Sequence, residues 1–577
     1  MGTIFCTMAH NSRRILLITA VSLSVALIYF SGMNSGSSLS SYSGVNVTVD
    51  ASSLGSQLNE DFIGSNWLNP GPDVPLMKTL GVQTSRIAAG FDGNTNGSPN
   101  YDCSTSVWNS SSLDSMVAAG ELAGAQPEII ILATPPCMVS NPGTNPAKTL
   151  PPDSSYTTAW ENLVTEMAVH EIETNHVTVY EIWNEPDWFE FWNGTMAQFF
   201  QLYSETSSAL EKAASETSTK IMIGGPTLAN VSGSMDTVWL DAFLSYVSTN
   251  NLPLDFFSWH LYADDPFGGP SPSSGPICLF PSDEGLPPNP CYYKQDLQSG
   301  IFGNEAQSVQ QELTNFPTLH PQLWIDEWNV DALYDPRMST DYDASYVLSA
   351  MQSSQNNGVS RMVYYDMSDG ANSPPPNGNF GMIDANGNPK PVYYAFQYWH
   401  DMAGSILSSQ VNQGGDPFTT GGVGVISTEN PTGVVHVAIY DFVPYDPSGE
   451  YGLNTPTKSN VNVSVNIANL PYANYNITFE RIGPDPTDVA DPVGSYSSGV
   501  EDFAVGLPEE GVVMAVLTPV GSELRVAPNT SVIPNALGAQ TGENFKLDLL
   551  GSLILLLAAT LIVVGLKKSK ITRNPKI

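Results

Sequence analysis

The sequence predicts an α/β protein: a (β/α)8 TIM barrel with a C-terminal β-sandwich domain, plus hydrophobic membrane segments at the N-terminal and C-terminal ends. Eight short runs rich in β-branched and aromatic residues alternate with eight amphipathic stretches, which is the pattern of parallel strands joined by helices. From Ser405 the pattern changes to short alternating segments separated by Gly, Pro and Asn, which is typical of a sandwich. The 577 residues are enough for a barrel of about 250 or more residues and a second domain.

The predicted strands and helices follow one another along the middle of the chain. The strands are the runs 62–66, 83–88, 128–134, 177–184, 220–224, 255–260, 322–327 and 361–366. The helices are the stretches 74–80, 113–122, 157–174, 196–216, 236–249, 305–316, 342–355 and 392–402. Thr195 stands at an N-cap position ahead of one of these helices. The predicted sandwich strands are 434–440, 461–467, 475–482 and 512–517, and we expect the alternating segment 45–49 to join them.

Apolar stretches at both ends of the chain predict membrane segments. Arg13 and Arg14 precede the stretch 15–30, which is typical of a signal peptide or an uncleaved signal anchor. The stretch 549–566 carries no charge and is followed by a basic cluster, which is typical of a transmembrane helix with a cytoplasmic tail, although a buried soluble helix can imitate it. The expected parts are a signal peptide or anchor (1–32), strands joining the sandwich (45–58), the barrel (59–403), the sandwich (404–520), a stalk (521–546), a transmembrane helix (547–566) and a basic cytoplasmic tail (567–577).

The charge and the cysteines agree with a cell-surface protein whose main part lies outside the cell. A net charge of −37 excludes nucleic acid and acidic membrane surfaces as partners. Charged residues are only 13% of the chain, so we interpret the scarcity of Lys and Arg as an adaptation to an acidic exterior. Several Asn-x-Ser/Thr sequons are compatible with a glycoprotein. Four cysteines remain for an oxidising exterior, and of their three possible pairings we prefer Cys103 with Cys137 and Cys278 with Cys291.

Two glutamates, Glu185 and Glu327, close the fourth and seventh predicted strands. In a barrel, the carboxyl ends of the strands form the active-site face. Hydrolysis of a glycosidic bond with retention needs a carboxylic acid and a carboxylate about 5 Å apart, and two strand ends can supply that separation. A single Glu at a strand end is usually a surface charge, but the pair predicts catalysis.

Neighbouring residues suggest a role for each glutamate. Glu185 follows Asn184, whose amide can bind a sugar hydroxyl, and it precedes a proline that turns the chain out of the strand. We therefore expect Glu185 to be the acid/base, with a pKa raised by burial against Trp183, and Glu327 to be the nucleophile. Arg86 ends the second strand and is expected to keep Glu327 ionised.

Four short motifs in this order resemble clan A glycoside hydrolases, nearest the family 39 group of β-xylosidases and α-L-iduronidases. The motifs are Asn184-Glu185-Pro186, His260-Leu261-Tyr262, Asp326-Glu327-Trp328-Asn329, and Gly381-Met382-Ile383-Asp384 leading to Pro389-Lys390-Pro391-Val392-Tyr393-Tyr394-Ala395-Phe396. The resemblance covers roughly residues 46–517. The second strand lacks the usual His after its Arg, and the eighth strand has no tryptophan where many relatives place one, so the sugar is not defined by the resemblance.

The resemblance implies retention of the anomeric configuration and a role for each matching residue. By position, Glu185 is the acid/base, Glu327 the nucleophile, Asn184 the hydroxyl ligand, and Tyr262 a hydrogen-bond partner of the nucleophile. Arg86 matches less closely.

Further residues of the expected cleft are candidates for contact with the substrate. His260 stands at a strand end and is either a cleft residue or a satisfied core histidine. Trp188 follows the acid/base and either stacks on a sugar face or belongs to the core. We also predict that Trp328 and Tyr365 bind substrate. The long Pro-rich loop 263–303 is expected to wall one end of the cleft.

Together these patterns predict an extracellular, membrane-anchored retaining glycoside hydrolase that acts on an oligo- or polysaccharide. The favoured activity is that of a β-xylosidase. The membrane partner is expected to be reached through the C-terminal helix. We expect no cofactor, no metal and no nucleic acid. The alternatives are an endo-acting β-glycanase, a glycosidase for uronic acids, and a non-catalytic glycan-binding protein of the cell surface.

Overall fold

The computed structural model describes most of the central part of the chain. The described residues are 43–91, 100–143, 145–231, 236–262, 277–278, 291–292, 298–330, 336–369, 380–444, 460–483, 492–497, 501–508 and 510–521. All of them belong to one compact unit, Met1–Arg525. The predicted signal segment, transmembrane helix and basic tail lie outside the described residues, as do nearly all of the stalk and most of the loop 263–303.

Eight parallel strands close into a barrel, in the same order around the barrel as along the chain. They are β2 (Gly64–Asn66), β3 (Thr84–Ala88), β6 (Gln126–Ile131), β7 (Val179–Ile182), β8 (Met222–Leu228), β9 (Phe256–Tyr262), β12 (Gln322–Asn329) and β13 (Arg361–Tyr364). Nearly every residue of these strands is buried, because barrel strands have side chains on one face and helices on the other.

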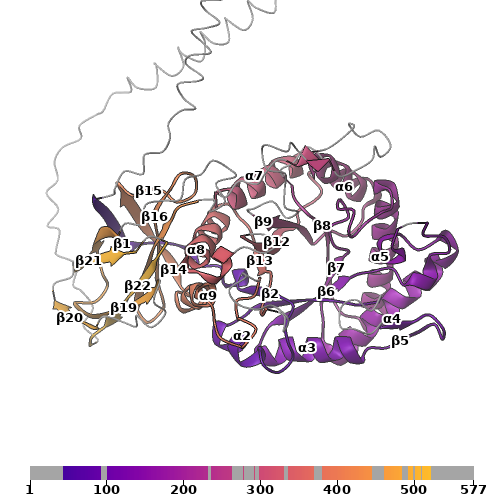
Figure 1. The fold of residues 1–577 in the computed structure, drawn as a ribbon, viewed down its shortest axis with the longest axis horizontal. Helices are drawn as coiled ribbons and strands as arrows, with labels where there is room; N and C mark the ends of the chain where they lie inside the picture. Colours follow the sequence, from indigo (N-terminus) through magenta and orange to yellow (C-terminus); the bar gives the residue numbers. More distant parts are fainter. Residues whose placement is uncertain are drawn as a thin grey trace, which may run out of the picture. The chain divides into compact units, whose positions relative to one another are not determined.

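Helices surround the barrel, as Figure 1 shows. They are α2 (Val74–Leu80), α3 (Ser111–Ala123), α4 (Thr157–Asn175), α5 (Met196–Thr217), α6 (Asp236–Asn250), α7 (Ile301–Leu313), α8 (Asp341–Asn356) and α9 (Pro391–Asp401). Helix α5 begins with a capping box, in which the Thr195 side chain accepts from the Gln198 N–H and the Gln198 side chain accepts from the Thr195 N–H. Helix α2 ends at Gly81, whose φ of 65° is left-handed.

Ten strands form the sheet of the second part of the fold. They are β1 (Ser43–Gln57), β14 (Ser405–Asn412), β15 (Gly415–Asp416), β16 (Gly421–Glu429), β17 (Val435–Phe442), β18 (Val461–Ala468), β19 (Asn474–Ile482), β20 (Pro492–Ser497), β21 (Glu501–Leu507) and β22 (Val512–Pro519). Strand β1 lies between β14 and β18 in this sheet, although the whole barrel separates it from them in the sequence. One core cluster combines side chains from both ends of the strand order, so the sheet folds over on itself as a sandwich.

The predicted barrel and sandwich are therefore present, whereas the described part of the structure does not bear out the predicted membrane segments. Among the helices that the structure describes, none is both long enough and apolar enough to cross a membrane. The sequence argument rested on the apolar stretches 15–30 and 549–566, and both lie outside the described residues.

Smaller differences concern the ends of elements. The first barrel strand is shorter than predicted, because residues Glu60–Phe62 form a 3-10 helix that Asn59 caps with its side chain. The helix predicted at 305–316 begins four residues earlier, at Ile301. Local propensity places an element more reliably than its ends, which depend on capping and tertiary contacts.

Candidate active site

Barrel strands bring most of the predicted site residues to one end of the barrel. Arg86 lies in β3, His260 and Tyr262 lie in β9, and Glu327 lies near the end of β12. Glu185 follows β7 by three residues. All of these positions are at or near the carboxyl ends of their strands, which is where barrel enzymes carry their chemistry.

The chain leaves β7 in an unusual backbone conformation. Trp183 has a φ of 77° and Glu185 a φ of 44°, both left-handed although neither residue is glycine. Such a conformation costs about 1–3 kcal/mol per residue and clusters at functional sites. The Glu185 N–H donates to the Thr227 carbonyl at 2.9 Å, and the Thr227 hydroxyl donates to the Trp183 carbonyl at 3.1 Å. Strand β8 thus holds the turn that presents Glu185.

A β-bulge positions Glu327. In the pairing of β12 with β9, Ile325 faces Trp259 and Glu327 faces His260, so Asp326 is one extra residue on β12. A bulge changes which face of the sheet the following side chains occupy. Here Asp326 and Glu327 are neighbours in sequence, and both have a carboxylate oxygen 3.7 Å from Nε2 of His260.

The two glutamates lie at the distance that a retaining mechanism requires. A carboxylate oxygen of Glu185, one of Glu327 and a ring nitrogen of His260 all lie within 4.8 Å of one another. Retaining enzymes place their carboxyl groups about 5–5.5 Å apart, whereas inverting enzymes separate them by about 6.5–9.5 Å. The arrangement therefore fits double displacement.

Each glutamate has its own partners. Glu185 Oε1 lies 2.7 Å from Nδ1 of His260. Glu327 accepts from the Tyr262 hydroxyl at 2.6 Å and from Arg86 Nη1 at 2.9 Å. Glu327, the predicted nucleophile, thus faces a cation and a hydroxyl donor. Glu185, the predicted acid/base, faces an imidazole ring.

Burial makes the two sides of the pair electrostatically different. Desolvation raises the pKa of Glu185 to about 8, against the opposing effect of the Arg86 charge. Desolvation also lowers the pKa of His260 to about 4, so its ring is neutral at pH 7. Glu185 is therefore protonated at neutral pH, as a proton donor to a leaving group must be.

The Arg86 guanidinium is the centre of a buried network. Its Nε and Nη2 both lie 2.8 Å from Oε2 of Glu181, Nη1 also donates to Asn66 at 3.1 Å, and Nη2 donates to Asn184 at 3.0 Å. Sequence reasoning missed Glu181 and Asn66. A signal for Glu181 was present, because a glutamate within the apolar run Val179–Ile182 needs a buried partner.

The predicted aromatic contacts divide into two groups. Tyr365 directly follows β13 and packs against Phe380, and burial, with the charges of Asp366 and Glu327, raises its hydroxyl pKa well above the usual range. The Trp188 side chain is buried, and its ring centroid lies 4.8 Å from the ring centroid of Phe189. Phe189 is 40% exposed.

Trp328 lies elsewhere. Its ring is fully buried and packs against aromatic side chains of α7, α8, β13 and α9, namely Phe302, Tyr346, Tyr364 and Phe396. The predicted contact with substrate is therefore corrected to a place in the packing between the barrel and its helices. Strand alternation is the reason, because Trp328 points away from the face that carries Glu327.

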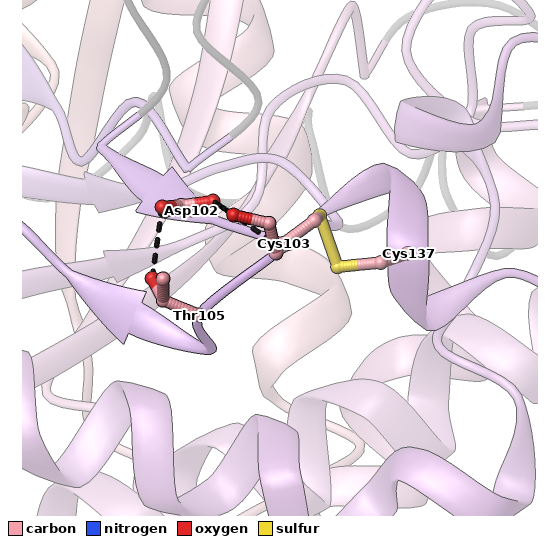
Figure 2. The surroundings of a disulfide bond; sticks show 5 residues. Asp102, Cys103, Thr105 and Cys137 are labelled. Atoms are coloured by element: carbon pink, nitrogen blue, oxygen red, sulfur yellow. Dashed lines mark hydrogen bonds between the residues drawn. A yellow bond between two sulfur atoms is a disulfide. The ribbon is translucent and has the colours of Figure 1, made fainter.

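A disulfide joins the loops that follow β3 and β6 (Figure 2). Cys103 and Cys137 have their Cα atoms 5.7 Å apart, within the usual range. Beside Cys103, the Asp102 carboxylate accepts from the Ser104 N–H and the Thr105 hydroxyl, both at 2.8 Å. The backbones of Cys278 and Cys291 are paired in a two-stranded ribbon, but their side chains lie outside the described part, so this second disulfide stays a prediction.

The chain matches known proteins over this same region. The model of the glycosyl hydrolases family 39 matches residues 129–275 and 279–482. A β-xylosidase of Caldicellulosiruptor saccharolyticus is 26% identical over 308 residues, which cover 51% of this chain and 56% of that one. A β-xylosidase of Geobacillus stearothermophilus is 23% identical over 259 residues, which cover 43% and 47%. The chain thus spans about half the length of these curated relatives.

The fold has solved counterparts too. The crystal structure of the family 39 (GH39) enzyme from Xanthomonas axonopodis pv. citri resembles it with a TM-score of 0.63 at 19% identity, over 85% of this chain and 100% of that one. The family match covers more than half of the chain and includes Glu185, His260, Tyr262 and Glu327. The chain belongs to glycosyl hydrolase family 39.

Proposed function

We propose that this protein is a retaining glycoside hydrolase that releases β-linked xylose from oligosaccharides. The observation that carries the proposal is the pair of Glu185, which is buried, and Glu327, which is partly exposed: their carboxylate oxygens lie within 4.8 Å of each other, and only Glu327 is paired with Arg86. A non-catalytic glycan-binding protein has no need for a protonated acid beside an arginine-paired carboxylate.

The geometry assigns a role to each carboxyl group. Glu327 attacks the anomeric carbon, and Glu185 gives its proton to the leaving oxygen, so that the glycosidic C–O bond breaks as the glycosyl ester forms. Glu185, now a carboxylate, then takes a proton from water, and the water oxygen displaces Glu327 from the sugar. Arg86 and Tyr262 hold the carboxylate of Glu327 in place before the attack and after its release.

Two kinds of observation support xylose as the substrate sugar. Both of the curated relatives named above are β-xylosidases. A uronic acid needs a cation for its carboxylate, and Arg86, which lies at the catalytic pair, is already shared by Glu181 and Glu327. We therefore favour a neutral sugar.

The test is the release of a chromophore from aryl glycosides by the full chain. We expect hydrolysis of an aryl β-xyloside, with the β-anomer of xylose as the first product seen by proton NMR. Faster cleavage inside a xylan chain than at its end would favour the endo-acting alternative, and no hydrolysis of any aryl glycoside would refute the proposed activity.

We also propose that the enzyme works outside the cell. The Cys103–Cys137 disulfide supports this location, because disulfides persist mainly in oxidising compartments. Fractionation of the source cells, followed by an activity assay of each fraction, tests it. Activity confined to the cytosolic fraction would contradict the proposal.

A further inference from the structure

Below the catalytic pair, the barrel interior contains more carboxyl groups than the mechanism uses. Glu128 of β6, Glu181 of β7 and Asp326 of β12 are fully buried, and an oxygen of each lies within 4.8 Å of the others. Three ionised carboxylates so close together in a dry interior repel one another strongly. At least one of them must carry a proton.

The hydrogen bonds identify which group is ionised. Glu181 accepts from Arg86 Nε at 2.8 Å and from the Ser258 hydroxyl at 2.7 Å, as expected of a carboxylate. Asp326 has no such donor: its oxygens are 4.0 Å from Arg86 Nε and 3.7 Å from His260 Nε2. Neither oxygen of Asp326 accepts a hydrogen bond from the described residues, and one of them lies within 4.8 Å of an oxygen of Glu181. Two carboxyl groups form a hydrogen bond only when one of them supplies a proton.

We propose that Asp326 is a positioning residue that stays protonated and donates to Glu181, so that Arg86 is shared by two carboxylates, Glu181 and Glu327, instead of three. The extra residue of the β12 bulge puts this acid beside the nucleophile. It acts on the reaction only through Arg86, and its catalytic effect rests on the proposed hydrolase function.

The groups that face Asp326 agree with this assignment. Burial first, and then the charge of Glu181, raise the pKa of Asp326 well above its usual range, with Arg86 opposing and Glu128 adding to the shift. Burial also raises the pKa of Glu128 to about 8, against the charges of Arg361 and Arg86.

Neutral forms of Asp326 and Glu128 reduce the number of negative charges around Arg86. With both of them neutral, Arg86 is paired with the carboxylates of Glu181 and Glu327. His260 faces Asp326 from β9 as a neutral ring, because its own pKa is lowered to about 4. An ionised Asp326 would add a third negative charge and weaken the hold of Arg86 on Glu327.

Two substitutions separate the proposal from a purely structural role. In Asp326→Asn the amide still donates to Glu181 and carries no charge, so we expect kcat and KM within about threefold of wild type and an unchanged pH profile. In Asp326→Leu the donor is lost, so we expect kcat to fall at least tenfold with KM little changed, and the acidic limb of the profile to move to higher pH. Asp61→Asn, at an exposed position, is the matched control and should change nothing.

The opposite protonation state predicts a different result. If Asp326 is ionised, Asp326→Asn removes a negative charge next to Glu327, and the acidic limb of the pH profile moves to lower pH. That shift would overturn the proposal.

Infrared spectroscopy decides the protonation state without any assay of hydrolysis. The difference between wild type and Asp326→Asn at pH 7 should show the loss of a carboxylic-acid C=O band. Loss of a carboxylate band instead would refute the proposal, even if Asp326→Leu fails to fold. If the infrared result is positive and no glycoside is hydrolysed, the proposed hydrolase function fails while the protonated Asp326 stands.

Discussion

The barrel and the sandwich bury their residues for different purposes. The upper barrel interior holds ionisable side chains with little or no exposure, among them Arg86, Glu181, His260 and Asp326. The sandwich core is an apolar cluster in which strands such as β18 alternate buried and exposed residues. A buried charge lowers stability unless it is paired. The comparison therefore shows that the barrel interior, and not the sandwich core, contains the groups that serve catalysis at the expense of stability.

The largest expected effect concerns the barrel alone. Glu327→Gln removes the nucleophile, so we expect kcat/KM for an aryl β-xyloside to fall about 10⁴-fold or more. Glu166→Gln, an exposed change on α4, serves as the control and should leave kcat/KM unchanged. Residual activity within tenfold of wild type would show that Glu327 is not the nucleophile.

The disulfide tests how far barrel loops contribute to stability. Its two cysteines are 34 residues apart, so replacing both Cys103 and Cys137 by serine should lower the free energy of unfolding by roughly 3–4 kcal/mol. Urea unfolding of the variant and of wild type measures this difference. An unchanged midpoint would mean that other contacts already hold these loops together.

A matched pair of isoleucines compares the two regions directly. Ile439 of β17 and Ile182 of β7 are both fully or almost fully buried, so each change to alanine should cost about 2–4 kcal/mol of unfolding free energy. Ile182 precedes the strained turn at Trp183, so only Ile182→Ala should also lower kcat. Equal kcat values for the two variants would show that the turn does not depend on its strand.

Stability should fall as the pH rises above about 6.5. Burial raises the pKa of Glu128 and of Glu185 to about 8, so in this range the folded protein keeps protons that the unfolded chain has lost. The loss is roughly 1.4 kcal/mol per pH unit for each group. Between about pH 4 and 6.5 the lowered pKa values of His260 and His436 act in the opposite direction. Thermal midpoints from pH 5 to 8.5 test this, and a steady rise above pH 7 would contradict it.

The smallest effect is a change in the pH profile. Because Glu185 must be protonated to act as the acid, kcat/KM should decline on the alkaline side with a midpoint near the Glu185 pKa of about 8. Initial rates from pH 5 to 9.5 measure it. An alkaline midpoint below pH 6 would mean that burial does not control this carboxyl group.

Much of the fold could be predicted from the sequence because its signals are local. Helix 74–80 was predicted with the ends that the structure shows, and the other barrel elements lie within a few residues of their expected places. Apolar periodicity and capping act within a few residues of each position. The motifs around Glu185 and Glu327 were also local, so the pair itself was accessible from the sequence.

Tertiary structure decided what the side chains face. No local pattern shows that Asp326 is the extra residue of a bulge, because the bulge exists only relative to the pairing with β9. Likewise Trp328 stands next to Glu327 in sequence but packs against the helices. Sequence determined which residues were available for catalysis, and strand pairing determined which of them share the buried arginine, since the low-dielectric environment and the neighbouring charges arise only when the barrel closes.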